Sequence, residues 1–348
     1  MTLHPQNSQA PASEPRLKLT RPAPDNLILP AQEIFDARAT LDAIETDIAD
    51  TPDPLAIRKA TVTHLNAARK AGRDAIADAF RAHPYSARKM TRSYTYLTDC
   101  LVEAAFLVAS KVLHPLSTPT EQERIALIAV GGYGRGEMAP QSDVDLLFLT
   151  PYKVTPWAES VIESMLYILW DLRLKVGHSS RTIRDCIRLG GEDFTIRTAM
   201  LEHRYLVGDR PLADDLEERL WSELFSGSSR EFIEAKLEER DLRHNKQGGQ
   251  RYVVEPNVKE GKGGLRDLQS LFWIAKYVHG VQHVADLVAM GVFTDEEFAT
   301  FRDAERFLWA VRGHLHLISG RATEQLTFDL QVEVAAQMGY VDARGRRA

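Results

Sequence analysis

Hydrophobic positions recur at helical spacing through the first third of the chain. Between residues 33 and 116 the apolar side chains fall three or four positions apart, which predicts about three amphipathic helices. The His83-Pro84 step is expected to break this pattern, because the residue before a proline disfavours helical geometry. Residues 1–30 lack such spacing and contain six prolines, so a disordered extension is predicted there.

The pattern then changes to short apolar runs. Residues 125–130 form one run that ends in glycines, and residues 144–149 form a second run with acidic residues at its head. Both are typical of buried strands, joined by a loop of about a dozen residues. Residues 156–174 return to helical spacing, with Pro156 suited to the first turn. A further strand can start at Lys175-Val176.

Beyond residue 195 the chain is mostly helical in pattern. Four segments have apolar residues at helical spacing, namely 212–225, 230–245, 265–278 and 295–318. The last follows Thr294-x-x-Glu297, a capping box in which a hydroxyl and a carboxylate satisfy the free amides of the first turn. The sequence therefore predicts an α+β fold, with a small mixed sheet flanked by helices and followed by a helical domain.

The expected domain organisation has three parts. Gly208, Asp209 and Pro211 cluster at a soft boundary, which separates a sheet-bearing domain at 31–207, preceded by the extension, from a helical domain at 208–348. The chain ends directly after an unfinished amphipathic stretch, and we expect the natural protein to be longer.

Charge and cysteine content exclude several classes of protein. The 348 residues carry a net charge of −6, which is not the footprint of a dedicated nucleic-acid binder. Cys100 and Cys186 are too few for a disulfide scaffold or a zinc site, so buried thiols and a cytoplasmic location are expected. No apolar stretch is long enough to indicate a membrane span, and no export signal is evident.

Two acidic residues stand at the head of the second apolar run. Because side chains on a strand alternate between faces, Asp143 and Asp145 are expected on one side. Val144, Leu146 and Phe148 are expected on the other. Two neighbouring carboxylates repel each other unless a cation neutralises them, and Mg²⁺ is the expected cation because it prefers oxygen ligands.

The segment before these acids is rich in glycine. Gly131 and Gly132 leave their backbone amides open to a triphosphate, and Ser142 adds a hydroxyl donor beside the acids. Phosphate on the loop and metal on Asp143 and Asp145 would support nucleotidyl transfer by two metal ions. The spacing matches neither a P-loop nor a dinucleotide fingerprint.

A second glycine-rich loop precedes the helix predicted at residue 265. It carries Lys259, Lys262 and Arg266 around Gly263-Gly264. Helix N-termini attract anions, so Lys259 and Arg266 are candidates to close over a bound nucleotide. The alternative is a helix entry with solvated charges, and both interpretations stay open.

The motifs resemble those of a known superfamily. Gly131-Gly-x-Gly-Arg-x-Glu137, followed by Pro140-x-Ser-Asp-x-Asp-Leu-Leu-Phe-Leu149, resembles the active-site signature of DNA polymerase β-like nucleotidyltransferases. The segments 176–182 and 255–269 are similar to signatures of the bifunctional PII uridylyltransferase/uridylyl-removing enzymes. These resemblances cover most of the chain from about residue 85.

The resemblance implies a specific reaction. UMP would move from UTP to a tyrosine hydroxyl of the PII nitrogen-signalling protein, with release of pyrophosphate and dependence on Mg²⁺ or Mn²⁺. Asp143 and Asp145 would bind the metal, and the nucleotide contacts would be Gly131, Gly132, Arg135, Ser142, Lys259 and Arg266. The superfamily supplies a third carboxylate from a later strand, for which Asp171, Asp185 and Asp193 are candidates and Asp193 is preferred.

Full-length members of the family continue into an HD phosphohydrolase domain and two ACT domains, and no histidine here precedes an aspartate. We therefore expect uridylyl removal and glutamine sensing to be absent from this chain.

Two other functions stay open for the same residues. An adenylyltransferase acting on another protein is one alternative to the uridylyltransferase. A regulatory module that binds nucleotide without catalysis is another.

Overall fold

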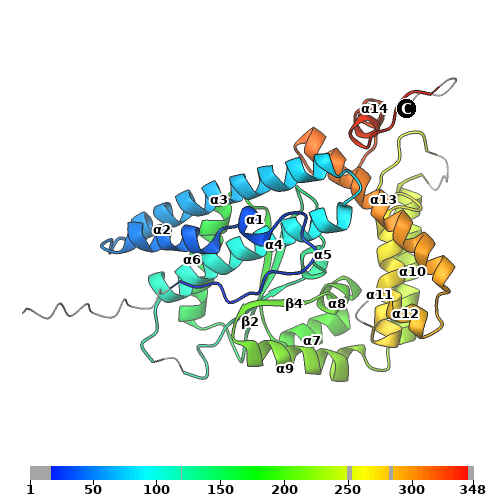
Figure 1. The fold of residues 1–348 in the computed structure, drawn as a ribbon. Coiled ribbons are helices and arrows are strands. Elements are labelled where there is room, and N and C mark those ends of the chain that lie inside the picture. Colours follow the sequence, from blue (N-terminus) through cyan, green and yellow to red (C-terminus); the bar gives the residue numbers. More distant parts are fainter. Residues whose placement is uncertain (1–16, 119, 249–252, 282–284, 344–348) are drawn as a thin grey trace, which may run out of the picture.

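The computed structural model describes residues 17–118, 120–248, 253–281 and 285–343. Its centre is a four-stranded sheet in the order β3-β2-β1-β4. Strand β1 is antiparallel to both β2 and β4, whereas β2 and β3 are parallel. This mixed sheet, surrounded by helices (Figure 1), confirms the predicted α+β fold.

Three of the four strands follow the predicted pattern. The strands are β1 Ala126–Ala129, β2 Val144–Thr150, β3 Val176–Thr182 and β4 Arg204–Gly208. The first two match the predicted apolar runs, and β3 starts where a further strand was expected. Strand β4 was not predicted, because its five residues begin with a charged side chain and lie among helical patterns. It is held as an edge strand by pairing with β1.

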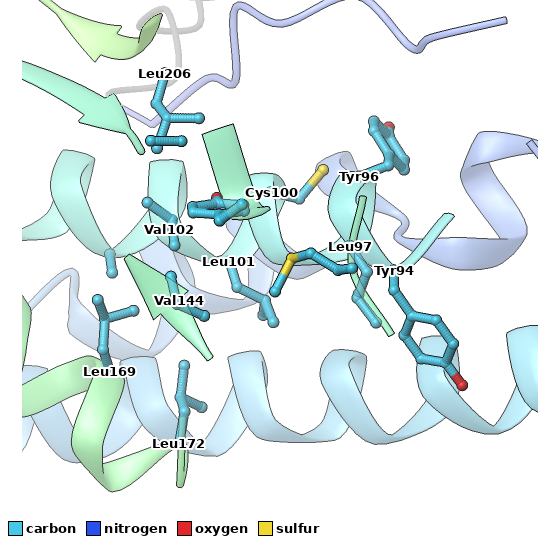
Figure 2. Packing of buried hydrophobic residues seen from close by; sticks show 14 of the residues in the cluster. Tyr94, Tyr96, Leu97, Cys100, Leu101, Val102, Val144, Leu169, Leu172 and Leu206 are labelled. Atoms are coloured by element: carbon cyan, nitrogen blue, oxygen red, sulfur yellow. The ribbon is translucent and has the colours of Figure 1, made fainter. Parts of the chain in front are cut away.

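Each face of the sheet packs against its own hydrophobic core. Val144, Leu146 and Phe148 of β2 lie in a core with the N-terminal helices, and Figure 2 shows Val144 packed near Leu101 and Leu169. The alternate residues of β2, Leu147 and Leu149, lie in a second core on the opposite face. The predicted alternation along this strand is therefore confirmed. Cys100 and Cys186 are both buried free thiols, as predicted.

The first core is built from the N-terminal helices. These are α1 Ala31–Ile34, α2 Ala37–Ile48, α3 Pro54–Ala82, α4 Ala87–Leu107 and a π-helix, η1 Val108–Leu113. They are more numerous than the three expected. The break predicted at His83-Pro84 is confirmed, since α3 ends at Ala82 with His83 as its C-cap. Almost every residue of α4 is buried, which places this helix at the centre of the protein.

The predicted extension of residues 1–30 is wrong for residues 17–30. Leu17 is buried, the Thr20 amide donates to Glu103 (2.8 Å) and the Arg21 guanidinium donates to Asp99 (2.6 Å). The sequence does not reveal this order, because the segment has many prolines and no apolar periodicity and is held in place by contacts with α4. Residues 1–16 lie outside the described ranges.

The second core lies under helices from the middle of the chain. They are α7 Ile183–Glu192, α8 Phe194–Leu201, α9 Arg210–Arg219 and the π-helix η2 Leu220–Phe225. Helix α6 Pro156–Asp171 instead packs in the first core, and the short helix α5 Gly131–Gly134 lies between β1 and β2. Pro156 occupies the first turn of α6, as predicted. Leu212, Leu216 and Leu220 belong to the core against the sheet. Helices α9 and η2 are thus packed on the sheet, although the predicted boundary assigned them to the helical domain.

The last helices lie on the right of Figure 1 and contribute side chains to both cores. They are α10 Ser229–Lys246, α11 Leu265–His279, α12 Asp286–Ala289, α13 Asp295–Ser319 and α14 Phe328–Gln337. The capping box of Thr294 and Glu297 at the start of α13 is confirmed. No helix in the described ranges has the length and apolar character needed to cross a membrane.

Candidate active site

The two predicted acids lie at the start of β2. Asp143 is exposed immediately before the strand, and Asp145 is half-buried within it. In the described ranges, neither carboxylate forms a hydrogen bond or an ion pair. The acids therefore share one side of the sheet, as the alternation predicts, and both are available to a ligand.

Two glycines enclose the Asp145 carboxylate. Gly177 of β3 is its partner in the parallel register, and a Cβ atom at residue 177 would lie 2.5 Å from Asp145 Oδ1. Gly131 lies on the other side, where a Cβ atom would be 3.5 Å from Oδ2. Gly131 has a φ of 59°, which favours glycine. Because neither glycine has a side chain, there is room for the Asp145 carboxylate beside them.

The charges around Asp145 fit a cation. Burial, and then the negative charge of Asp143, raise the pKa of Asp145, whereas the nearby Lys259 ammonium lowers it. A pair of unpaired carboxylates that repel each other is a suitable donor set for Mg²⁺ or Mn²⁺. In the described ranges no three His, Cys, Asp or Glu side chains are close enough together to hold a metal ion.

The predicted third carboxylates all have structural partners. Asp171 pairs with Arg58 at 3.2 Å, and Asp185 forms a capping box with Thr182. Asp193, the preferred candidate, caps α8 by accepting hydrogen bonds from the amides of Thr195 (2.6 Å) and Ile196 (3.1 Å). The structure does not bring Asp193 together with Asp143 and Asp145.

The glycine-rich segment turns tightly beside the acids. Gly131 and Gly132 begin the short helix α5, and Gly134 packs so closely on residue 202 that a Cβ atom would lie 2.0 Å from the Glu202 carbonyl oxygen. The Ser142 hydroxyl accepts a hydrogen bond from the Ala139 amide at 2.9 Å. That bond uses a lone pair of the oxygen and leaves the hydroxyl proton free to be donated.

Arg135 has a structural role in the described chain. Its guanidinium pairs with Glu137 at 2.6 Å and with Glu202 at 2.5 Å, and the Trp273 indole also donates to Glu202 at 2.5 Å. These bonds tie the glycine-rich segment to α11. Glu202 was not found from the sequence, because its partners are 67 and 71 residues away.

Lys259 comes to the acids from the second glycine-rich loop. The Asn257 side chain accepts hydrogen bonds from the amides of Lys259 (3.1 Å) and Glu260 (2.7 Å), which fixes the turn. Arg266, the other predicted cation, pairs with Glu260 at 3.2 Å and lies over the Trp273 ring. Lys259 lies close enough to Asp145 for its charge to lower the pKa of that carboxyl, and both Lys259 (3.8 Å) and Arg266 are partly neutralised by Glu260.

A buried cluster supports both loops. Arg312 of α13 pairs with Glu324 at 2.8 Å, and the Val258 amide donates to the Glu324 carbonyl oxygen at 2.9 Å. His316 accepts a hydrogen bond from the Gln141 amide at Nδ1 (3.3 Å), close to Asp143. The end of α13 thus positions the loop of Lys259 and the turn before the acids.

The Glu324 cluster makes stability depend on pH. Burial would raise the pKa of Glu324, but His316 and Arg312 outweigh it and lower the pKa to about 2. The ionised Glu324 carboxylate stabilises the folded state fully above its ordinary pKa of 4.5. This stabilisation is lost as the pH falls toward the pKa that Glu324 has in the folded protein. We expect Glu324→Gln to lower the free energy of unfolding by on the order of 3 kcal/mol at neutral pH, because Arg312 loses its buried partner.

Chemical denaturation of both proteins at several pH values checks this expectation. The difference between wild type and Glu324→Gln should shrink as the solution is acidified below the ordinary glutamate pKa. A difference that stays constant with pH would contradict the proposed charge interaction.

Comparisons with known proteins match two segments of this chain. Residues 116–205 match the family model of the nucleotidyltransferase domain, and residues 231–348 match that of GlnD PII-uridylyltransferase. Asp143 and Asp145 lie in the first match and Lys259 lies in the second.

Curated relatives carry one common name, bifunctional uridylyltransferase/uridylyl-removing enzyme. The Ruegeria pomeroyi protein is 68% identical over 90% of this chain and 34% of its own length. The Cereibacter sphaeroides protein is 62% identical over 97% of this chain and 36% of its own. The Novosphingobium aromaticivorans protein is 49% identical over 90% and 34%. The chain spans about a third of the length of these relatives.

Proposed function

We propose that this chain, which belongs to the family of the bifunctional uridylyltransferase/uridylyl-removing enzymes, transfers UMP from UTP to a tyrosine hydroxyl of the PII nitrogen-signalling protein and releases pyrophosphate. The observation that carries this proposal is the position of Asp143 and Asp145, which have no ion-pair partner among the described residues, with Asp145 beside Gly131 and close to the charge of Lys259. The two buried free thiols favour the cytoplasm as its location.

Each part of the site has a distinct task in this reaction. Asp143 and Asp145 would hold Mg²⁺ or Mn²⁺, which supplies charge neutralisation at the phosphates and activates the attacking hydroxyl. The amides of Gly131 and Gly132 and the Ser142 hydroxyl would donate to the triphosphate. The bond formed joins the tyrosine oxygen to the α-phosphorus, and the bond broken releases pyrophosphate.

Lys259 would stabilise the negative charge that moves onto the leaving pyrophosphate. It comes from the segment that matches GlnD PII-uridylyltransferase, and burial, together with the charges of Arg312 and Arg266, lowers its pKa. A cation held in place before the reaction needs little reorganisation as charge develops. In this proposal the site takes residues from both matched segments.

The Lys259 assignment gives a direct prediction. Lys259→Met should lower the rate of transfer by about a hundredfold, as expected for loss of one preorganised charge. Lys262→Met, on the same loop but exposed, serves as the matched control and should keep nearly full activity. Steady-state pyrophosphate release measures both variants, and equal losses would contradict the assignment.

The proposed reaction is tested by mass spectrometry of the PII protein after incubation with this chain, Mg²⁺ and UTP. A mass gain of one UMP, absent when either PII or the metal is left out, is the expected result. ATP in a parallel reaction separates this function from adenylyl transfer. No modification with either nucleotide, in a protein that still binds UTP, would favour a non-catalytic module.

A further inference from the structure

A cavity lies next to the glycine-rich segment, with Gly134, Arg135 and Gly136 on its wall. It has a volume of about 620 Å³ and is bounded by the start of α4, the segment after α5, and the facing sides of α11 and α13, elements that can be followed in Figure 1. Neither Asp143 nor Asp145 lines it. Its volume is within the usual range for pockets that hold small organic ligands.

The walls of this cavity carry an excess of positive charge. Eight Lys and Arg side chains line it, against three Glu side chains. Glu137 and Glu202 both pair with Arg135, so these three side chains together carry one negative charge. Glu305 remains. Burial and the charge of Glu137 raise its pKa to about 7, although the charges of Arg88 and Arg135 act in the opposite direction. At neutral pH this carboxyl is therefore only partly ionised.

Two of these cations lie on one face of α4, where Glu137 and Asp25 partly offset the charge of Arg92 and Glu305 that of Arg88. Arg88 and Arg92 are one helical turn apart, so their side chains lie on the same face of the helix. Within the described part of the chain neither has an ion-pair partner. Burial and the charge of Arg88 lower the pKa of Arg92, which indicates that the two cations disfavour each other. An anion bound between them would relieve that repulsion.

The wall formed by α11 and α13 carries aromatic side chains as well as Arg302 and Arg306. Phe272 of α11 and Phe298 and Phe301 of α13 line the same cavity and are each only partly buried. Aromatic side chains favour contact with planar, apolar groups. A ligand that contacts both the arginines of α4 and the phenylalanines of α11 and α13 therefore carries a negatively charged group at one end and a ring at the other.

We infer that this cavity is a second binding site, for a small organic phosphate with an aromatic ring. Its phosphate lies against Arg88 and Arg92, and its ring lies against Phe298 and Phe301. Arg guanidinium groups suit phosphate because their fixed donors match its oxygens. The inference rests on the cavity alone and does not depend on the proposed transfer reaction.

Calorimetric titration with AMP, in the presence of EDTA, tests this site. Saturable binding at one site is expected, and it should weaken by about tenfold or more in Arg88→Ala/Arg92→Ala, because charge-assisted hydrogen bonds are lost. Arg38→Ala/Arg230→Ala, which removes two highly exposed arginines, is the matched control and should bind as wild type does. Asp143→Ala/Asp145→Ala should also bind AMP normally, which separates this cavity from the acidic site.

Two further ligands test the two ends of the site. Adenosine lacks the phosphate and inorganic phosphate lacks the ring, so both should bind more weakly than AMP. The inference is overturned if AMP shows no saturable binding, if removing Arg88 and Arg92 leaves its affinity unchanged, or if inorganic phosphate binds as tightly as AMP.

Discussion

Asp145→Asn is expected to lower the proposed UMP transfer to the PII protein by about a thousandfold or more, because it removes a carboxylate from the pair that would hold the metal. The amide has nearly the same shape as the carboxylate, so the contacts with Gly131 and Gly177 are kept. What changes is the negative charge. Steady-state kinetics with saturating metal measure the loss.

The same variant should keep or increase the stability of the fold. Burial and the charge of Asp143 raise the pKa of Asp145, so ionisation of this group destabilises the folded state. A raised carboxyl pKa contributes stability only below the unfolded value, and that contribution is lost as pH rises through the folded pKa. Asparagine cannot ionise, so the free energy of unfolding at neutral pH should not fall. A large fall would mean that Asp145 has an unrecognised stabilising partner.

Asp193→Asn is the matched control. Asparagine caps helices about as well as aspartate does, so the hydrogen bonds from the Thr195 and Ile196 amides are preserved while the charge is removed. If Asp193 only caps α8, this variant keeps its activity. A loss comparable to that of Asp145→Asn would instead support Asp193 as the third carboxylate.

The sequence predicts well those features that depend on neighbours in the chain. The alternation of Asp143, Val144 and Asp145 follows from strand geometry alone, and the two separate cores confirm it. The same holds for the capping box before α13 and for the break before Pro84. In each case the physical cause acts over a few residues, so the pattern suffices.

The features that the sequence did not reveal depend on distant partners. Residues 17–30 are held by acids of α4, 78 to 83 residues away, and β4 is held by pairing with β1. Likewise, the partner of His316 is the Gln141 amide, 175 residues away. Ionic and hydrogen-bonding partners at such separations are not encoded in local spacing.

Gly177 is the clearest case of a site residue that only the strand register reveals. In the sequence it is a single glycine near the start of a strand, and such a glycine usually marks a bulge or a close approach. The parallel register places it beside Asp145. Gly177 lies against a carboxylate oxygen of Asp145 rather than against backbone. A larger side chain at residue 177 would therefore displace the Asp145 carboxylate and leave the fold unchanged.

Gly177→Ala is therefore expected to lower transfer by about a hundredfold with little change in stability. The added methyl group would lie 2.5 Å from Asp145 Oδ1, so the carboxylate must turn away, and a displacement of about 1 Å at a reacting centre can cost this much. The free energy of unfolding should change by less than about 1 kcal/mol, because alanine also restricts the unfolded chain.

Gly191→Ala provides the comparison, since a Cβ atom there meets no other atom within 4 Å. It should leave both activity and stability close to wild type.

Manganese affinity, measured by calorimetry, tests whether the Gly177→Ala substitution disturbs the metal site. It should fall with activity, because the displaced group is one of the two carboxylates. A Gly177→Ala protein that binds Mn²⁺ and transfers UMP as well as Gly191→Ala would show that the position of the Asp145 carboxylate does not limit the reaction, and the metal assignment would then have to move to other residues.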